Sequence, residues 1–441
     1  MYANQVAEIQ GLYGPFTLSE RVIQKVWLRQ DFVSMNLKTM SGKSLVIKDP
    51  GRWNVHEGPD FKEARLLLDD IELIGDVEVH LNLLDWHYHQ HANDANYDRV
   101  LLHVVLHLDH GTDSFGRVRT SKGDTPELLY LLPLMEQDLE SYAMEDALLE
   151  LEQQDELEWV VRFLELPFEE RMRVLKRRAL IRWQQKIKYA QQRLEAEDWE
   201  AACHSYALEV LGYKRNRTPM LRLASRHPLV QMRSEVCGCR TRLDVEHRTE
   251  VNVEHRTLNF ELRIGTLGRV GESVDVDYEA LVAGRLFDEE AEHWKLNGLR
   301  PANHPRRRLV QYLQIVAKQP HWPDRLADCL KQFPATSSGS GTAVFRKVNG
   351  LKGLRVQLSE SVFCSIVGEK RFNTLTVDAI LPLATAAGLL DGFEYWLHWF
   401  PGDCPSALQR FLKQVGAVNR RNPLSNGLIQ GALGLFLDHG V

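Results

Sequence analysis

The stretch from Gly58 to Val105 constrains the fold of this chain more than any other part of the sequence. It contains two acids, Asp60 and Glu78, each next to residues that favour β-strands, and a dense group of histidines follows them. Burying an ionised carboxylate costs free energy unless a partner compensates its charge. A bound cation is the simplest such partner. The stretch therefore predicts a metal-dependent catalytic site, most simply of the nuclease type.

The hydrophobic pattern around this stretch predicts an α/β core over residues 1–130. Thr17 and Glu20 fit a capping box, and apolar residues recur at helical spacing directly after them. The later segments either alternate apolar with polar residues, as half-buried strands do, or are continuously apolar, as buried central strands are. The expected strands span residues 44–49, 61–70, 73–84 and 99–109. The order is a helix, three strands, a helical or looped connection and a last strand.

The remainder of the chain is expected to be mainly helical. Residues 131–232 contain an acidic helical segment (136–158) and then a basic one (171–193), and we expect these two to pair with each other. Residues 233–280 include the tandem sequence VEHRTEVN–VEHRTLNF, which predicts an inserted hairpin or a flexible loop. Two copies are too few for a solenoid. Helical patterns resume and continue through residues 281–441.

The two acids suit a hard divalent cation. Mg²⁺ takes oxygen ligands, usually one or two carboxylates together with water and substrate phosphate. We expect Asp60 and Glu78 to ligate Mg²⁺ or Mn²⁺, with the backbone carbonyl of Val79 as a further ligand. His80 lies two residues after Glu78, so its side chain points to the same face of the strand. There it would orient or deprotonate the attacking water.

Other residues near the two acids have alternative interpretations. Glu20 is an auxiliary acid of the site or a helix-capping residue, and the capping role is favoured. His87 and His89 would have auxiliary catalytic or phosphate-contacting roles. On a strand, His87, His89 and His91 would share one face and form a separate transition-metal site, which would make the protein a different kind of metallo-hydrolase.

A nucleic-acid partner would have to bind a local basic patch. The net charge of −6 excludes a molecule that binds polyanions over its whole surface. Clustered basic residues are the footprint expected of phosphate contacts. The candidate nucleic-acid-binding residues are Lys214, Arg215, Arg217, Arg306 and Arg307.

The motifs GPDF and GDVEVH resemble the PD-(D/E)XK pattern of restriction-endonuclease-like nucleases, with His80 in place of the usual lysine. The resemblance implies an α-β-β-β-α-β core and metal-dependent hydrolysis of DNA or RNA. The histidines that follow, with Asp94 and Tyr97, are similar to those of very-short-patch repair endonuclease relatives. Over most of its length the chain resembles the bacterial domain of unknown function 2851 family, which carries no established activity. The matching segments include LKTMSGKSLVIKDPGRWNVHEGPDF, LGYKRNRTPMLRLA and LRPANHPRRRL.

Several classes of protein are excluded at the level of motifs. There is no glycine-rich phosphate loop, nucleophile elbow or dinucleotide fingerprint. No apolar run reaches the ~18 residues of a membrane span, and no export signal is visible, so a cytoplasmic protein is expected. The six cysteines form no regular framework, which agrees with a reducing compartment. The main alternative to a nuclease is a catalytically inactive protein of the same fold that binds nucleic acid or a protein partner.

Overall fold

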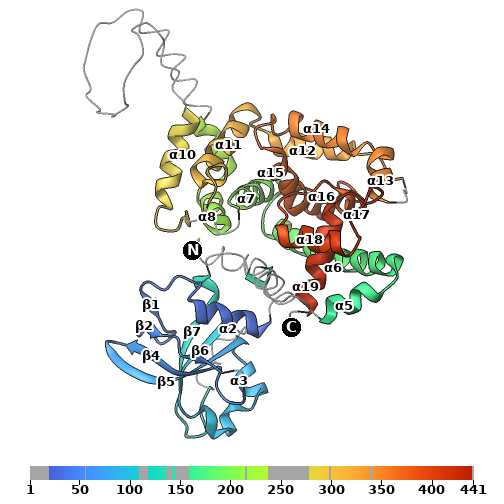
Figure 1. Ribbon diagram of the computed structural model, residues 1–441. Coiled ribbons are helices and arrows are strands. Elements are labelled where there is room, and N and C mark those ends of the chain that lie inside the picture. The colour runs from blue at the N-terminus through green and yellow to red at the C-terminus, as the bar shows by residue number, and fades with distance from the viewer. Residues whose placement is uncertain are drawn as a thin grey trace, which may run out of the picture.

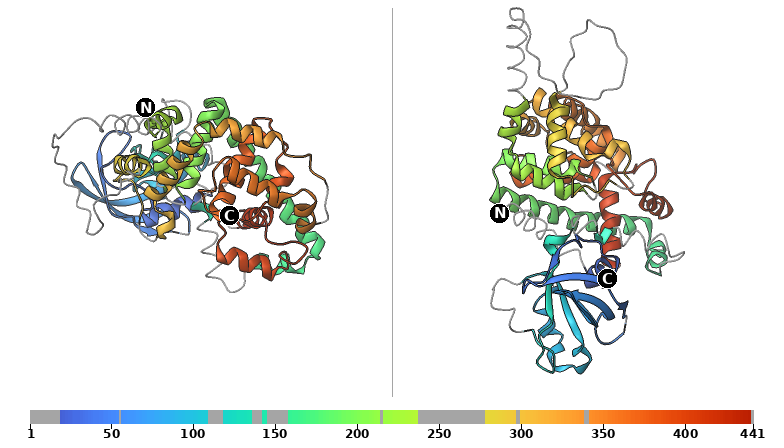
Figure 2. Two further views of the ribbon diagram at one scale, coloured as in Figure 1. Left: turned by 90° about the horizontal axis from the view of Figure 1, so that it is seen from above. Right: turned by 90° about the vertical axis from the view of Figure 1, so that its left-hand side faces the viewer.

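The structure is a computed structural model of the chain. Strands gather in one part of the molecule and helices in the other, with the long helix α6 between them (Figure 1; Figure 2, right). The described residues are 19–54, 56–108, 118–135, 142–144, 158–213, 216–236, 278–296, 299–337 and 341–439.

A mixed β-sheet forms the first part. Its strands lie in the order β1-β2-β4-β5-β6-β7, and β3 pairs with β4. Pairing is antiparallel from β1 to β5, but β5, β6 and β7 run parallel. The strands span Leu37–Lys38 (β1), Ser44–Asp49 (β2), Arg52–Trp53 (β3), Phe61–Leu68 (β4), Ile71–Asn82 (β5), Val100–His107 (β6) and Glu127–Tyr130 (β7).

Helix α2 (Glu20–Arg29) covers one face of this sheet. Its apolar residues, among them the fully buried Trp27, pack in one cluster with Val77 and Val79 of β5 and with Val104 of β6. Because side chains alternate along a strand, Glu78 and His80 point to the opposite face. The sheet therefore presents its polar residues away from the α2 core.

The opposite face is covered by the segment between β5 and β6. This segment begins with the short helix α3 (Asp85–Tyr88) and continues through two 3₁₀ turns, His91–Asn93 and Ala95–Tyr97. Trp86 and Tyr97 pack there against Val105 of β6. Strand β6 is thus buried on both faces, as its continuous apolar run predicts.

The second part is built from helices. The 29-residue helix α6 packs against the C-terminal helix α19, and Gly431 allows their close approach: a Cβ there would lie 2.3 Å from the carbonyl oxygen of Leu175. These helices span Glu158–Glu165 (α5), Phe168–Ala196 (α6), Trp199–Leu211 (α7), Arg217–Arg226 (α8), Tyr278–Glu289 (α10), Pro305–Lys318 (α11), Trp322–Lys331 (α12), Thr342–Val348 (α13), Leu351–Ser361 (α14), Glu369–Leu375 (α15), Leu381–Ala386 (α16), Phe393–His398 (α17), Ser406–Gln414 (α18) and Asn426–His439 (α19), with a π-helical turn at Thr376–Ile380.

The mixed α/β class is confirmed, and each expected strand is present within a few residues of its predicted position. The short strands β1, β3 and β7 were not expected. The capping box is wrong: α2 begins at Glu20, so this residue occupies the first helical position, and the N-cap is Ser19, whose side chain makes no capping hydrogen bond. Nearly all of the acidic segment and most of the 233–280 insert lie outside the described residues, so the expected pairing of the acidic and basic segments stays a prediction.

Among the helices that the structure describes, none combines the length and the apolar character needed to cross a bilayer.

Candidate metal centre

The two acids and His80 lie together at the point where β4 begins beside β5. Asp60 directly precedes β4, and its backbone N–H donates to Glu78 Oε2 at 3.0 Å. Glu78 and His80 are two residues apart on β5, and their side chains meet, with Glu78 Oε1 3.3 Å from His80 Nε2. The two acids and His80 are therefore close together, as the sequence predicts, while their role as metal ligands stays a prediction.

The Asp60 carboxylate is held from two sides. Its Oδ1 accepts a hydrogen bond from the Gln24 side chain of α2 at 2.7 Å, and its Oδ2 accepts one from the Val79 N–H at 3.0 Å. The N–H and C=O of a strand residue point toward the same neighbour. The Val79 carbonyl therefore lies on the Asp60 side of β5, where the sequence places a backbone ligand.

Two further histidines reach the same point from the α3 segment. His89 Nδ1 is 3.2 Å and His91 Nε2 is 3.3 Å from His80 Nε2. His91 Nε2 is also 3.2 Å from Glu78 Oε1. We call Glu78, His80, His89 and His91 the metal cluster.

The spacing of these donor atoms fits a cation. Imidazole nitrogens bind Zn²⁺ at about 2.0–2.1 Å, which separates neighbouring ligands by roughly 3.0 Å in an octahedral site and roughly 3.4 Å in a tetrahedral one. The four measured separations within the metal cluster, 3.2–3.3 Å, lie between these limits. The donor atoms of His80, His89 and His91 all lie within 4.8 Å of one another. A single ion can therefore contact Glu78, His80 and His91 together with small adjustments, and His89 lies beside them next to His80.

A second layer of residues orients the imidazoles. His103 on the neighbouring strand β6 places its Nε2 2.8 Å from His80 Nδ1, so the other ring nitrogen of His80 faces the metal cluster. Such a partner on the second nitrogen is the usual way in which a ligating histidine is fixed. Tyr97 stacks on His91 at 3.7 Å between ring centroids, and Trp86 packs edge-on against both His80 and His91.

Burial and neighbouring charges perturb the titration of the acids. Burial, with the Glu78 charge nearby, raises the pKa of Asp60 to about 8. Burial acts in the same direction on Glu78, but hydrogen bonds to His80 and His91 outweigh it and lower the Glu78 pKa. Burial also raises the pKa of Glu20. The site therefore holds one carboxyl that favours its charged form beside others that resist ionisation.

Two of the imidazoles, His89 and His103, resist protonation. Burial, followed by the charge of His80, lowers the pKa of His89, and burial lowers that of His103 well below its ordinary value. His80 is fully buried and His91 is 6% exposed, whereas His89 is exposed. The metal cluster therefore meets solvent on its His89 side.

Of the other predicted catalytic residues, Glu20 lies at the site and His87 does not. Glu20 lies at the site, with its Oε1 3.8 Å from His80 Nε2. His87 does not join it: its exposed side chain lies on α3, outside the metal cluster. The expected helical or looped connection is present, since residues 85–88 are helical and residues 91–93 form a 3₁₀ turn, so His87, His89 and His91 do not share one face of a strand. His80 takes the place of His87 in the group of three.

The candidate nucleic-acid residues lie in the helical part. Arg306 and Arg307 are exposed near the start of α11, and Arg217 lies 3.6 Å from Asp378 across an ion pair. Lys214 and Arg215 lie outside the described residues.

The sequence analysis did not assign three residues to the site that contains Asp60, Glu78 and His80. Gln24 follows Glu20 by one helical turn, a spacing that places both on one face of α2. His91 was visible in the HxHxH pattern but was assigned to a separate site. His103 lies within a continuous apolar run of a buried strand, which gave no signal beyond a core histidine.

Comparison with known proteins places part of the chain in a family. No curated protein and no solved structure matches it. Residues 20–237 match a family model described as a protein of unknown function (DUF2851), a range that contains the whole metal cluster. This match places residues 20–237 in the DUF2851 family.

Proposed function

We propose that the protein is a metal-dependent phosphodiesterase that hydrolyses DNA or RNA at the metal cluster. The observation that carries the proposal is the convergence of Glu78, His80 and His91 on one point, with donor atoms 3.2–3.3 Å apart and Asp60 alongside. A carboxylate beside imidazoles, next to a second acid at the start of a strand, is a donor set suited to a cation that activates phosphate chemistry.

The donor set favours Mn²⁺ over Mg²⁺. Mg²⁺ demands oxygen ligands and imidazole suits Fe²⁺ and Zn²⁺, whereas Mn²⁺ favours carboxylate and water and is the transition metal nearest to Mg²⁺ in its ligands. Glu78 with two or three imidazoles is therefore a poor Mg²⁺ site, and the expectation of either metal narrows to Mn²⁺, with Zn²⁺ as the competing ion. In this arrangement Asp60 is a neighbouring acid that can take part as a ligand when its carboxyl ionises.

Each residue would have a distinct role in hydrolysis. A cation held by Glu78, His80 and His91 would supply the positive charge that stabilises the phosphoryl transition state. His89, exposed at the edge of the metal cluster, would accept the proton of the attacking water as its oxygen bonds to phosphorus. Glu20, at the same edge, would donate a proton to the leaving oxygen as the P–O bond breaks. His80, which stands at the position of the usual lysine of the motif, would then bind the metal and would not act on the water.

Two features support nucleic acid as the substrate. The order of helix, antiparallel strands, crossover and parallel strand agrees with the core that the PD-(D/E)XK resemblance implies. Exposed Arg306 and Arg307 offer contacts to a phosphate backbone.

The test is cleavage of labelled single- and double-stranded DNA and RNA by protein loaded with Mn²⁺, Mg²⁺ or Zn²⁺. Cleavage should require Mn²⁺, and it should fall at least 100-fold in Glu78→Gln and in His80→Ala. His87→Ala is the matched control, because this imidazole is exposed and outside the metal cluster, and it should cleave like the wild type. Cleavage that survives in Glu78→Gln would refute the proposal.

A catalytically inactive, metal-binding protein is the second candidate. The observation that favours it is the depth of the metal cluster: His80 is fully buried and Glu78 is 5% exposed. Mn²⁺ or Zn²⁺ that binds stoichiometrically, raises the unfolding temperature and supports no cleavage of any of the four substrates would select this function over the nuclease.

A further inference from the structure

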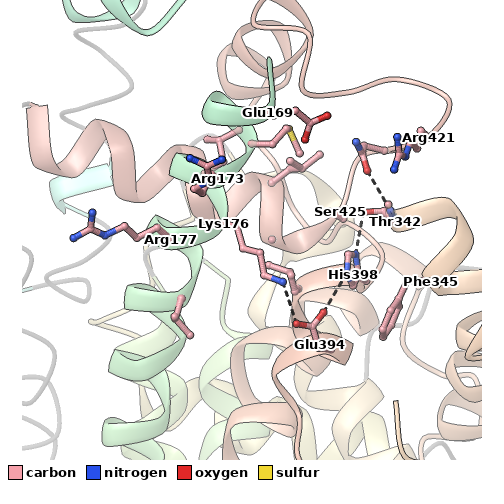
Figure 3. Close-up of a pocket in the computed structure, with 18 of the residues that line it drawn as sticks. Glu169, Arg173, Lys176, Arg177, Thr342, Phe345, Glu394, His398, Arg421 and Ser425 are labelled. Atoms are coloured by element: carbon pink, nitrogen blue, oxygen red, sulfur yellow. Dashed lines mark hydrogen bonds and ion pairs between the residues drawn. The ribbon is translucent and has the colours of Figure 1, made fainter. Parts of the chain in front are cut away.

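A pocket of about 790 Å³ opens in the helical part of the molecule, among segments that are far apart in the sequence (Figure 3). Its walls come from the first half of α6, the start of α13, the end of α17 and the turn that leads into α19. No residue of the sheet lines it. Its volume lies within the range of sites for small organic molecules, roughly 300–1,000 Å³.

A chain of polar contacts crosses one wall of this pocket. Thr342 Oγ1 lies 3.0 Å from His398 Nδ1, and His398 Nε2 lies 3.4 Å from Glu394 Oε2. The other oxygen of Glu394 accepts a hydrogen bond from Lys176 Nζ at 3.1 Å. Figure 3 shows these four side chains in a row, with dashed lines joining each to the next. Hydrogen bonds to His398 and the charge of Lys176 lower the Glu394 pKa, so this carboxylate is ionised and already neutralised by its partners.

The charges around the opening are mainly positive. Arg173, Lys176 and Arg177 come from α6, and Arg421 reaches the pocket from the opposite side (Figure 3). Glu169 and the neutralised Glu394 are the acids that line the pocket. Arg173 also pairs with Glu170 beside the pocket, and with this acid counted the charges around the opening still leave a small positive excess, although the whole chain is acidic.

The walls between these polar groups are apolar. The side chains responsible are those of Phe168, Met172, Leu175, Leu180, Leu397 and Leu428. A cavity with apolar walls and a few convergent polar groups is the usual form of a small-molecule site. Guanidinium groups match the oxygen atoms of a phosphate with paired hydrogen bonds.

We propose that this pocket binds a small phosphorylated organic molecule, with its phosphate between Arg421 and Lys176 and its organic body against the apolar wall. The His398–Thr342 pair offers an imidazole and a hydroxyl beside the phosphate, which fix its position. The site is separate from the metal cluster and does not depend on the proposed phosphodiesterase.

The test is calorimetric titration of the full chain with AMP and with hexyl phosphate, two phosphate monoesters with different organic bodies. At least one should bind with a Kd below about 1 mM, and adenosine, 1-hexanol and inorganic phosphate should each bind at least tenfold more weakly. Tighter binding of AMP would identify a nucleotide as the natural class, and tighter binding of hexyl phosphate an alkyl phosphate. Failure of both monoesters to bind would overturn the proposal.

Variants then locate the site. Arg421→Gln and Lys176→Gln should each weaken binding of the monoester about tenfold, or about 1.4 kcal/mol, because each removes a charged hydrogen-bond donor to the phosphate. Both side chains are exposed, so these variants should keep the wild-type circular dichroism spectrum. Arg420→Gln is the matched control: Arg420 is exposed, adjacent in the chain and absent from the lining, and its affinity should stay within about twofold of wild type. If all three variants bound the monoester with the affinity of the wild type, the ligand would lie elsewhere and the assignment would be refuted.

Discussion

His204 should make the stability of the helical part depend on pH. This side chain on α7 is 2% exposed; its Nδ1 lies 2.5 Å from the Tyr312 hydroxyl, and its Nε2 lies 2.9 Å from the carbonyl oxygen of His227. Both ring nitrogens are therefore used by the neutral ring, with Nε2–H donating to the carbonyl. Burial lowers the pKa of His204 to about 4, from an ordinary value of 6.5.

The sign and size of the effect follow from this shift. Below the ordinary pKa the unfolded chain binds a proton at His204, but the folded protein does not, so stability is lost as the pH falls toward 4. Each pKa unit corresponds to about 1.4 kcal/mol. Between about pH 7 and about pH 4.5, we expect His204 alone to remove roughly 2–3 kcal/mol from the free energy of unfolding.

The assay is urea unfolding at both pH values, followed by tryptophan fluorescence. His204→Gln keeps an amide N–H for the His227 carbonyl but cannot be protonated, so its stability should fall with pH by roughly 2–3 kcal/mol less than that of wild type. His321→Gln removes an exposed imidazole and should show the wild-type pH dependence. Parallel losses of stability in wild type and His204→Gln would refute the reasoning, whatever the stability of the variant at pH 7.

Further changes probe the metal cluster and the packing. His91→Ala should weaken Mn²⁺ binding at least tenfold in a calorimetric titration, whereas His87→Ala should not; equal affinities would remove His91 from the ligand set. Trp27→Ala empties a fully buried position and should cost about 3–5 kcal/mol in urea unfolding. Gly431→Ala forces a Cβ against the backbone of α6 and should destabilise the protein by about 1–3 kcal/mol. Gly353→Ala, at an open helical position, should instead stabilise it by about 0.5–1 kcal/mol; thermal unfolding of both variants checks the opposite signs.

The sheet was predictable because its strands carry strong local patterns. Residues 99–109 are apolar on both faces, and β6 is indeed buried on both faces. The pairing of Glu78 with His80 followed from strand periodicity alone. The short strands β1, β3 and β7 were not predictable, because two to four residues carry too little pattern and depend on neighbours that are distant in the sequence.

The metal cluster was predicted only in part. The alternative in which the HxHxH imidazoles share a strand face does not hold, because the segment after β5 turns into α3 and a 3₁₀ turn, which brings His89 and His91 back toward His80 and leaves His87 in solvent. That reversal depends on tertiary packing of Trp86 and Tyr97 against β6. A strand periodicity applied to a turn cannot reveal it.

The packing of α19 against α6 limits how the chain can be truncated. The family match ends at residue 237, but the helix that lies along α6 begins at residue 426, and its Leu437 also packs against the hydrophobic cluster of the sheet. A fragment cut at the boundary of the match would lose this helix and leave the apolar side of α6 and a patch of the sheet open to water. We expect such a fragment to aggregate on expression, while co-expression with a segment that contains α19 should restore a soluble complex.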